Sequence, residues 1–315
     1  MKTITIPGLE KPVSTLIQGS DYFKPSIYEK VCTVLDRFFK IGGTTIDTAH
    51  VYCGGESEVA IGQWLKDRDN REDVVILTKG AHHDKNGPRV NPAAIRQDLF
   101  ESLERLQTNY VDLYALHRDD PDVPVSDIID ELNKHINSGR IKAIGISNWS
   151  VERIQEANDY AKANGLVGFT FNSPNLSLAK ANEPFWPGCV SADEAYCAWH
   201  EEHQLPLLSW SSQARGFFTG RFSPDDHSNA DLVRVFYNDA NWERLRRAEE
   251  LAKEKGVNKI QIALSYVLNQ PFPTCALIGA QNEEELLSCY EGSKIMLTRE
   301  ELNWLEKVST PTSNS

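Results

Sequence analysis

Hydrophobic residues recur along this chain with two spacings, which alternate from the N-terminal to the C-terminal end. Short, nearly continuous apolar runs such as Val111–His117 have the length and residue types of strands buried on both faces. Between them, apolar residues return every three or four positions, as in Ser26–Ile41, which stops at Gly42-Gly43. That spacing, with a glycine cap behind it, is typical of an amphipathic helix. The pattern predicts alternating strands and helices.

The same criteria extend along the chain. We expect strands at Lys2–Ile6, Val13–Gln18, Thr44–Asp47, Val74–Lys79, Val111–His117, Ile141–Ser147, Val167–Asn172, Pro206–Trp210 and Thr274–Gly279. We expect helices at Ser26–Ile41, Glu56–Lys66, Asn91–Leu106, Ser126–Ser138, Val151–Asn164, Ala192–His203, Asn241–Lys255, Lys259–Leu268, Glu283–Glu291 and Arg299–Lys307. The first strand, followed by Pro7-Gly8, is predicted to be one arm of a short β-hairpin, and the segment from Trp210 to about Asn238 is predicted to be irregular.

About eight strand–helix units follow one another without a linker, which predicts one α/β domain over residues 1–315. Such a repeat favours a closed (β/α)8 TIM barrel, with extra helices and the short N-terminal β-hairpin. The alternative, an open doubly wound sheet, calls for a Gly-x-Gly-x-x-Gly turn after an early strand. Gly42-Gly43 and Gly54-Gly55 do not provide that turn, so we predict the barrel.

Composition narrows the class of protein. The chain has 315 residues, 40% of them hydrophobic, and a formal net charge of −12. The acidic balance argues against nucleic acid or an anionic membrane as a partner. Six scattered cysteines without a Cys-x-x-Cys pair, and no recognisable signal peptide or membrane-spanning run, favour a cytoplasmic protein with reduced thiols. Nothing in the pattern indicates an oligomeric state.

Three of the predicted strands end in a single ionisable residue. These are Asp47, Lys79 and His117, and Tyr52 lies on the loop just after Asp47. In a (β/α)8 barrel, catalytic groups gather at the carboxyl ends of the strands. A lysine beside a tyrosine lowers the pKa of the phenol, and a carboxylate keeps the lysine charged and placed. Such a site can protonate an alkoxide as it forms, which suits the reduction of a carbonyl by hydride.

Several stretches, taken together, resemble the aldo-keto reductase superfamily along nearly the whole chain. They are Ile46–Glu58, Leu77–Gly80, Val111–His117, Gly139–Asn148, Trp210–Arg221 and Leu277–Ala280. The resemblance implies Tyr52 as general acid, Lys79 and Asp47 as the pair that tunes it, and His117 as the residue that orients the substrate. It also implies that NADPH, or alternatively NADH, supplies the hydride.

The resemblance further implies a set of cofactor-binding residues. Ser147, Asn148 and Ser173 would hold the carboxamide, Trp210 would stack on the nicotinamide, Ser211, Arg215, Gly216 and Arg221 would follow the pyrophosphate, and Gly279, Gln281 and Glu285 would lie near the ribose. Ser173 stands where the family has a glutamine, so water or the preceding Asn172 would complete that contact. Acidic residues replace the usual arginine near the ribose 2′ position, which leaves NADPH and NADH both open, with Arg221 as the compensating cation.

Loops at the same end contain the candidate substrate residues Tyr22, Arg118 and Trp149. Other polar residues in these loops, Asp21, His82, His83 and Asp119, favour a sugar-like or polyhydroxylated carbonyl compound. No metal site is predicted, because His200-Glu-Glu-His203 lacks the His-Glu-x-x-His order and is interpreted as a solvated helix face.

The leading hypothesis is an NAD(P)H-dependent reductase of an aldehyde, ketone or sugar-like carbonyl. The alternative is a cofactor-sensing regulatory subunit resembling the potassium-channel β subunits, which would bind cofactor but turn over slowly. A third possibility, an unrelated barrel isomerase, predicts no nicotinamide binding.

Overall fold

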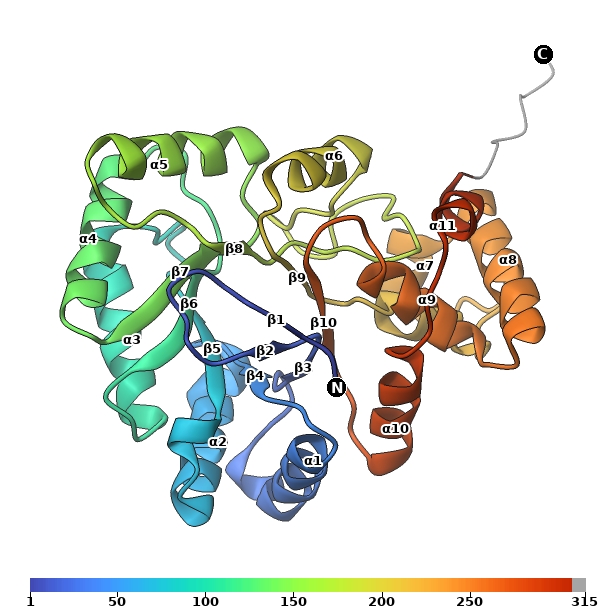
Figure 1. The fold of residues 1–315 in the computed structure, drawn as a ribbon, viewed down its shortest axis with the longest axis horizontal. Coiled ribbons are helices and arrows are strands. Elements are labelled where there is room, and N and C mark those ends of the chain that lie inside the picture. The colour runs from blue at the N-terminus through green and yellow to red at the C-terminus, as the bar shows by residue number, and fades with distance from the viewer. Residues whose placement is uncertain (308–315) are drawn as a thin grey trace.

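The computed structural model describes residues 1–307, and eight of their strands form a closed parallel barrel (Figure 1). Going round the barrel, the strands are β10 (Thr274–Ile278), β3 (Leu16–Gly19), β4 (Thr45–Asp47), β5 (Val75–Gly80), β6 (Val111–Leu116), β7 (Ile141–Ile146), β8 (Phe171–Asn172) and β9 (Leu207–Ser209). This arrangement confirms the predicted (β/α)8 class. The single domain was predicted for residues 1–315, and residues 308–315 of it lie outside the described residues.

Helices surround the barrel on its outer side (Figure 1). They are α1 (Tyr28–Lys40), α2 (Glu56–Arg68), α3 (Pro92–Arg105), α4 (Val125–Asn137), α5 (Val151–Ala163), α6 (Glu194–His203), α7 (Ala230–Phe236), α8 (Asp239–Lys255), α9 (Lys259–Leu268), α10 (Glu283–Gly292) and α11 (Arg299–Glu306). Short 3-10 turns occur at η1 (Pro25–Ile27), η2 (Tyr52–Gly55), η3 (Arg71–Asp73) and η4 (Ala214–Thr219). None of the helices in residues 1–307 is long and apolar enough to cross a membrane.

Alternation along each strand divides the core into two layers. In β5, Val75 and Leu77 belong to the cluster inside the barrel, whereas Ile76 belongs to the larger cluster between the strands and the helices. Both faces of the strand are therefore buried, which explains the nearly continuous apolar runs. Leu113 and Ala115 of β6 continue the inner cluster.

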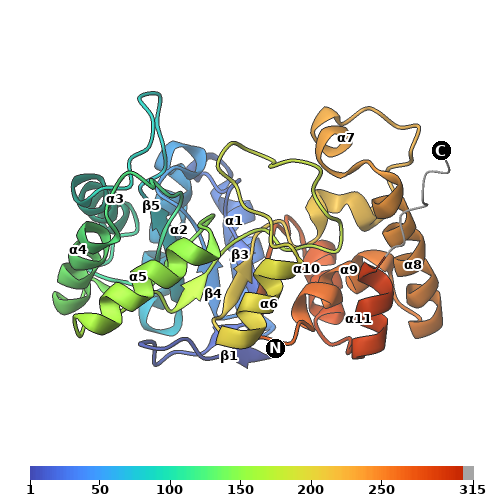
Figure 2. The same cartoon turned by 90° about the horizontal axis from the view of Figure 1, so that it is seen from above.

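The N-terminal hairpin closes one end of the barrel. β1 (Thr3–Ile4) pairs antiparallel with β2 (Val13–Ser14), and Ile6 and Val13 join the cluster inside the barrel. Figure 2 shows this hairpin on the side opposite to the loop after β5, the long loop after β8 and α7. The hairpin plugs the amino-terminal end of the strands and leaves those loops at the carboxyl-terminal end.

Three predicted elements differ from the structure. The predicted strand Val13–Gln18 is divided between β2 and β3, because Thr15 separates a residue pair in the hairpin from a strand in the barrel. The strand predicted at Val167–Asn172 is only β8, Phe171–Asn172. The segment predicted to be irregular up to about Asn238 contains α7, whose N-cap Asn229 accepts a hydrogen bond from the Leu232 backbone N–H.

Candidate active site

Three neighbouring strands bring the predicted proton-transfer residues to one end of the barrel. Asp47 is the last residue of β4, Lys79 is the second-last of β5, and His117 directly follows β6. The parallel register pairs Asp47 with Leu77 and Lys79 with Ala115, so the carboxyl ends lie side by side. Tyr52 begins the turn η2, immediately beyond β4.

The Lys79 ammonium connects this group. It is 1% exposed and donates to Asp47 Oδ1, to the Thr48 carbonyl oxygen at 2.9 Å and to the Tyr52 hydroxyl oxygen at 3.2 Å. All three protons of the ammonium therefore have acceptors. One of them points at the oxygen of the predicted general acid.

Burial governs the pKa of Tyr52. Removal from water and the charges of Asp47 and Asp21 raise this pKa well above its usual value near 10.0. The net direction is opposite to the lowering that we expected beside Lys79, because desolvation of the buried phenolate outweighs the opposing charge of Arg118. Tyr52 consequently carries its proton at neutral pH. A proton donor requires that state.

The other two members of the group respond to the same surroundings. Burial raises the pKa of Asp47 to about 6, against the opposing effect of Lys79, so this carboxyl is mainly ionised at neutral pH. Burial, together with the charges of Lys79 and Arg118, holds the pKa of His117 well below its usual range, so the imidazole is neutral. Its ring lies edge-on to Tyr52, with the centroids 5.7 Å apart.

The turn that contains Tyr52 is held by a partly buried polar network. The His50 N–H donates to the Lys79 carbonyl oxygen at 2.9 Å, and Arg105 Nη1 donates to the His50 carbonyl oxygen at 2.9 Å. Arg105 also pairs with Glu58, a fully buried residue of α2, and His50 Nε2 lies 2.7 Å from a Glu101 oxygen. These contacts join α2 and α3 to the turn and position Tyr52.

The predicted carboxamide residues lie together where β7 and β8 end. Ser147 Oγ donates to the Ser173 carbonyl oxygen at 2.6 Å, and Asn148 Nδ2 donates to Ser147 Oγ at 2.9 Å. Asn172 does not replace the missing glutamine. Its amide donates to the Tyr196 hydroxyl at 2.7 Å and lies 3.0 Å from His200 Nε2, beneath α6, so it faces the outer layer of the fold.

The residues predicted to hold the nicotinamide and pyrophosphate follow β9. The Trp210 ring packs on the cluster inside the barrel, and its buried Nε1 has no hydrogen-bond partner in the described residues. Ser211 and Arg215 have positive φ angles of 49° and 50°, which are strained for residues with a side chain. Gly216 follows with φ 87°, and Arg221 is exposed at the end of the loop. An aromatic surface, two cations and a loop held in an unusual backbone conformation fit a dinucleotide.

Beyond β10, the remaining predicted cofactor residues line a loop that is open at Gly279, where an added Cβ would meet nothing within 4 Å. Glu285 accepts from the Gln281 backbone N–H at 2.9 Å, so one of its oxygens caps the start of α10. Lys30 of α1 donates to Gln281 Oε1 at 3.1 Å. It brings a cation to this loop that our sequence analysis did not include.

The three predicted substrate residues have different environments. The Tyr22 hydroxyl donates to the Ala280 carbonyl oxygen and so ties the loop after β3 to the loop after β10. Trp149 is fully buried, packs against Phe169 and donates from Nε1 to the Arg118 carbonyl oxygen at 2.9 Å. Trp149 therefore holds the backbone of Arg118 in place. Arg118 itself is buried beside His117.

The long loop after β8 contributes residues that the sequence analysis missed. Trp186 lies 6.0 Å from the Trp210 ring, and the Arg215 guanidinium lies over the Phe185 and Trp186 rings at 4.8 and 5.3 Å. In the sequence, these aromatic residues in a proline-rich segment could have indicated a binding loop. Their contacts with Trp210 and Arg215, however, depend on the path that the loop takes in the folded chain.

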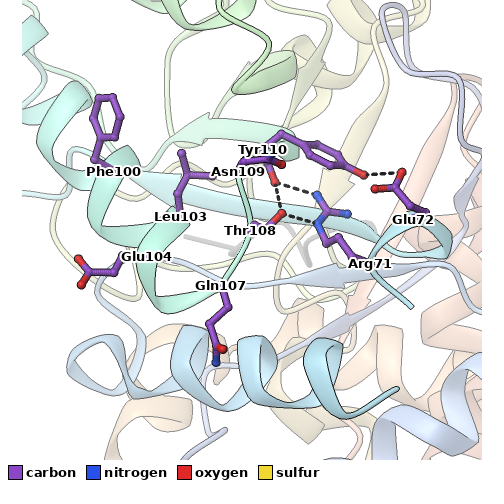
Figure 3. A pocket seen from close by; sticks show the side chains of 9 residues that line it. All are labelled: Arg71, Glu72, Phe100, Leu103, Glu104, Gln107, Thr108, Asn109 and Tyr110. Carbon is purple, nitrogen blue, oxygen red and sulfur yellow. Dashed lines mark hydrogen bonds between the residues drawn. The ribbon is translucent and has the colours of Figure 1, made fainter. Parts of the chain in front are cut away.

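Two other features lie outside this group. His200 is fully buried and bonded to Leu205 and Asn172, so the interpretation of His200–His203 as a solvated face is wrong for its first residue. A hollow of about 650 Å3 lies at the amino ends of β5 and β6, where Arg71 donates to Thr108 and to the Tyr110 carbonyl oxygen (Figure 3). None of the predicted site residues lines this hollow.

Comparison with known proteins identifies relatives over nearly the whole chain. The model of the Aldo/keto reductase family matches residues 16–310. Norsolorinic acid reductase B of Aspergillus parasiticus is 28% identical over 301 residues, covering 92% of this chain and 77% of its own. The solved structure of a glycerol dehydrogenase from Gluconobacter oxydans superposes with a TM-score of 0.78 at 24% identity, covering 98% of both chains. An aldo/keto reductase from Klebsiella pneumoniae, solved with NADP and acetate, gives a TM-score of 0.73 at 24% identity, with coverage of 96% and 94%.

Proposed function

The chain belongs to the aldo/keto reductase family and is an oxidoreductase, and on that premise we propose that it reduces an aldehyde or ketone with Tyr52 as the proton donor. The observation that carries this proposal is the Lys79 ammonium, which donates both to Asp47 and to the Tyr52 hydroxyl oxygen in a buried site next to His117. NADPH is the expected cofactor, with NADH as the alternative, and the Klebsiella relative was solved with NADP.

Each residue of the group has a defined task in this proposal. The carbonyl oxygen binds between Tyr52 and the neutral His117, whose N–H orients it. When bound, the nicotinamide supplies the hydride for the carbonyl carbon. As negative charge develops on the oxygen, the Tyr52 hydroxyl transfers its proton to it. Lys79 then stabilises the phenolate through the contact of 3.2 Å, and Asp47 keeps the ammonium in place.

Residues after β7, β9 and β10 would hold the cofactor. Ser147 and Asn148 present hydroxyl and amide groups to a carboxamide, Trp210 offers a ring face, and Arg215 and Arg221 offer charge to the pyrophosphate. The unpartnered Trp210 Nε1 and the open position at Gly279 support this assignment.

A panel of aldehydes, ketones and sugars, assayed with both NADPH and NADH, tests the reaction and the cofactor together.

Replacing Tyr52 by Phe should lower the rate of carbonyl reduction by about 10²- to 10⁴-fold, because the positioned acid is lost, while cofactor binding measured by fluorescence persists. Tyr110→Phe is the matched control, since that phenol lies at the other end of the barrel and donates to Glu72 at 3.1 Å.

Full turnover in Tyr52→Phe would remove this residue from the proposed role. Tight cofactor binding with negligible turnover of every carbonyl compound would instead favour the regulatory-subunit alternative.

A further inference from the structure

Arg118 is a buried cation that the proposed proton transfer does not use. Its side chain is 7% exposed, Nη1 donates to the His117 carbonyl oxygen at 2.8 Å, and Nε is buried with no hydrogen-bond partner. Within residues 1–307, no carboxylate forms an ion pair with its guanidinium. Arginine keeps its charge at any physiological pH, and removing that charge from water without a partner is unfavourable.

Two acidic groups at this end of the barrel are committed to other cations. Asp47 pairs with Lys79, and Asp119, the residue after Arg118, lies 3.4 Å from Arg153. Asp21, whose charge acts on Tyr52, is exposed to solvent. The positive charge of Arg118 is therefore left without a protein counter-charge in the described residues.

The side chain and the backbone of Arg118 are both held in place. The loop after β8 passes over the side chain, since a Cβ added at Gly188 would lie 3.5 Å from Arg118 Cδ and 3.8 Å from Nε. The backbone is held by Trp149, whose Nε1 donates to the Arg118 carbonyl oxygen at 2.9 Å. A group held in this way has little freedom to find another partner, which is typical of a pre-organised binding residue.

Arg118 also lies at the reacting end of the barrel. It follows His117 directly, and its charge acts on the pKa values of Tyr52, His117 and His82. Burial lowers the pKa of His82 to about 4, so this imidazole is neutral near pH 7 and contributes no second positive charge. Its Nδ1 is already engaged with the His83 carbonyl oxygen at 2.8 Å.

We propose that Arg118 binds a carboxylate on the substrate, so that this enzyme acts on aldehydes or ketones that carry a carboxylate group. The planar guanidinium with free N–H groups matches a carboxylate, and a charged acceptor satisfies both its charge and its unpaired donor. This inference rests on the proposed function and specifies its substrate class. It differs from the sugar-like substrate that the loop polarity favoured, and two of those polar residues, Asp119 and His82, make contacts within the protein.

The kinetic test compares substrates that differ in one charge. We expect kcat/KM to be at least about tenfold higher for 3- or 4-carboxybenzaldehyde than for the corresponding methyl ester, the effect of one charge-assisted contact. The Arg118→Gln variant should lose this preference, and Arg118→Lys should keep part of it. Arg68→Gln is the control, because it removes the same charge from an exposed pair with Asp36, and should preserve the preference.

Equal kcat/KM for acid and ester in the wild-type protein would overturn the proposal. So would an equal loss of both substrates in Arg118→Gln, which would show that the residue only supports the fold or the reacting groups.

A binding measurement separates this inference from the proposed reaction. Titration calorimetry with the cofactor-loaded protein should detect benzoate but not benzamide, and benzoate binding should weaken at least about tenfold in Arg118→Gln. If no aldehyde is reduced but benzoate binds through Arg118, the reaction is wrong and the anion site stands. If aldehydes are reduced but benzoate binds no better than benzamide, the reaction stands and the anion site is wrong.

Discussion

At the scale of single residues, burial decides what each ionisable group can do. Tyr52, Asp47, Lys79 and His117 were expected to act through their mutual charges, and they do lie together. Desolvation is nevertheless the largest influence on the pKa values of Tyr52, Asp47 and His117. It keeps the proton on the phenol and removes it from the imidazole, which suits the roles that we propose for Tyr52 as donor and for His117 as neutral orienting group.

The pKa of Asp47 leads to a prediction for pH dependence. The folded protein raises this pKa from 3.8 to about 6, so Asp47 takes up a proton as pH falls through 6 and stops anchoring the Lys79 ammonium. We therefore expect kcat/KM for reduction to decline below pH about 6. Asp47→Asn should lose this acidic limb and turn over about 10- to 100-fold more slowly at neutral pH.

The raised pKa of Asp47 affects stability in the opposite direction to the rate. Because the native state holds the Asp47 proton more tightly than the unfolded chain, this group makes the protein less stable as pH rises from about 4 to about 6. Rate profiles and urea unfolding of the wild-type and Asp47→Asn proteins between about pH 4 and about pH 8 check the two effects. An unchanged acidic limb in Asp47→Asn would assign it to another group.

At the scale of elements, the turn η2 shows how backbone geometry and side-chain contacts combine. Cys53, Gly54 and Gly55 all have positive φ angles, of 50°, 67° and 95°. Glycine adopts this region without strain, so Cys53 sits where a glycine would be the easier choice. The turn is tight enough to bring Tyr52 back to Lys79.

Alanine substitutions at the two glycines of this turn should lower the free energy of unfolding by different amounts. A Cβ at Gly55 would lie 2.6 Å from Arg105 Cζ, whereas a Cβ at Gly54 would meet nothing within 4 Å. Both alanine variants carry backbone strain, of about 1 kcal/mol. Gly55→Ala must also displace Arg105 from His50 and Glu58, so we expect a total loss of about 2–4 kcal/mol and a clear fall in kcat/KM.

Urea unfolding and steady-state rates of the two variants measure these effects. Equal losses in Gly54→Ala and Gly55→Ala would mean that backbone strain alone matters and that Arg105 does not position Tyr52.

At the scale of the whole molecule, stability and chemistry occupy opposite ends of the barrel. The hairpin fills the amino-terminal end with Ile6 and Val13, and the reacting groups lie at the carboxyl-terminal end (Figure 2). The cluster inside the barrel lies between the two ends.

This separation predicts a variant that loses stability without losing function. Ile6 is 1% exposed, and Ile6→Ala should lower the free energy of unfolding by about 2–5 kcal/mol through the cavity it leaves. At a temperature where the protein stays folded, kcat/KM should be unchanged. Ile4→Ala, at a partly buried position of the same hairpin, should cost less. A large change in KM for Ile6→Ala would show that the plug and the site are coupled.

The sequence predicted most of the elements because each strand and helix has a local cause. Gly42-Gly43 indicates where a helix stops, and Pro92 lies at the first helical position of α3. The failures have different causes, one of them tertiary. Val13–Gln18 reads as one strand although its two halves pair with different partners, and α7 depends on the capping residue Asn229 within a segment that otherwise lacks periodicity.

By itself the sequence determined the barrel and the position of the candidate residues in it, because strand periodicity places Asp47, Lys79 and His117 at strand ends. Tertiary structure alone decided the pKa values, since desolvation depends on everything packed around a group. It also decided that Asn172 turns away towards His200, and that Arg118 has no carboxylate partner within residues 1–307 while Asp119 pairs with Arg153. Those outcomes depend on contacts between segments far apart in the chain, which no local pattern encodes.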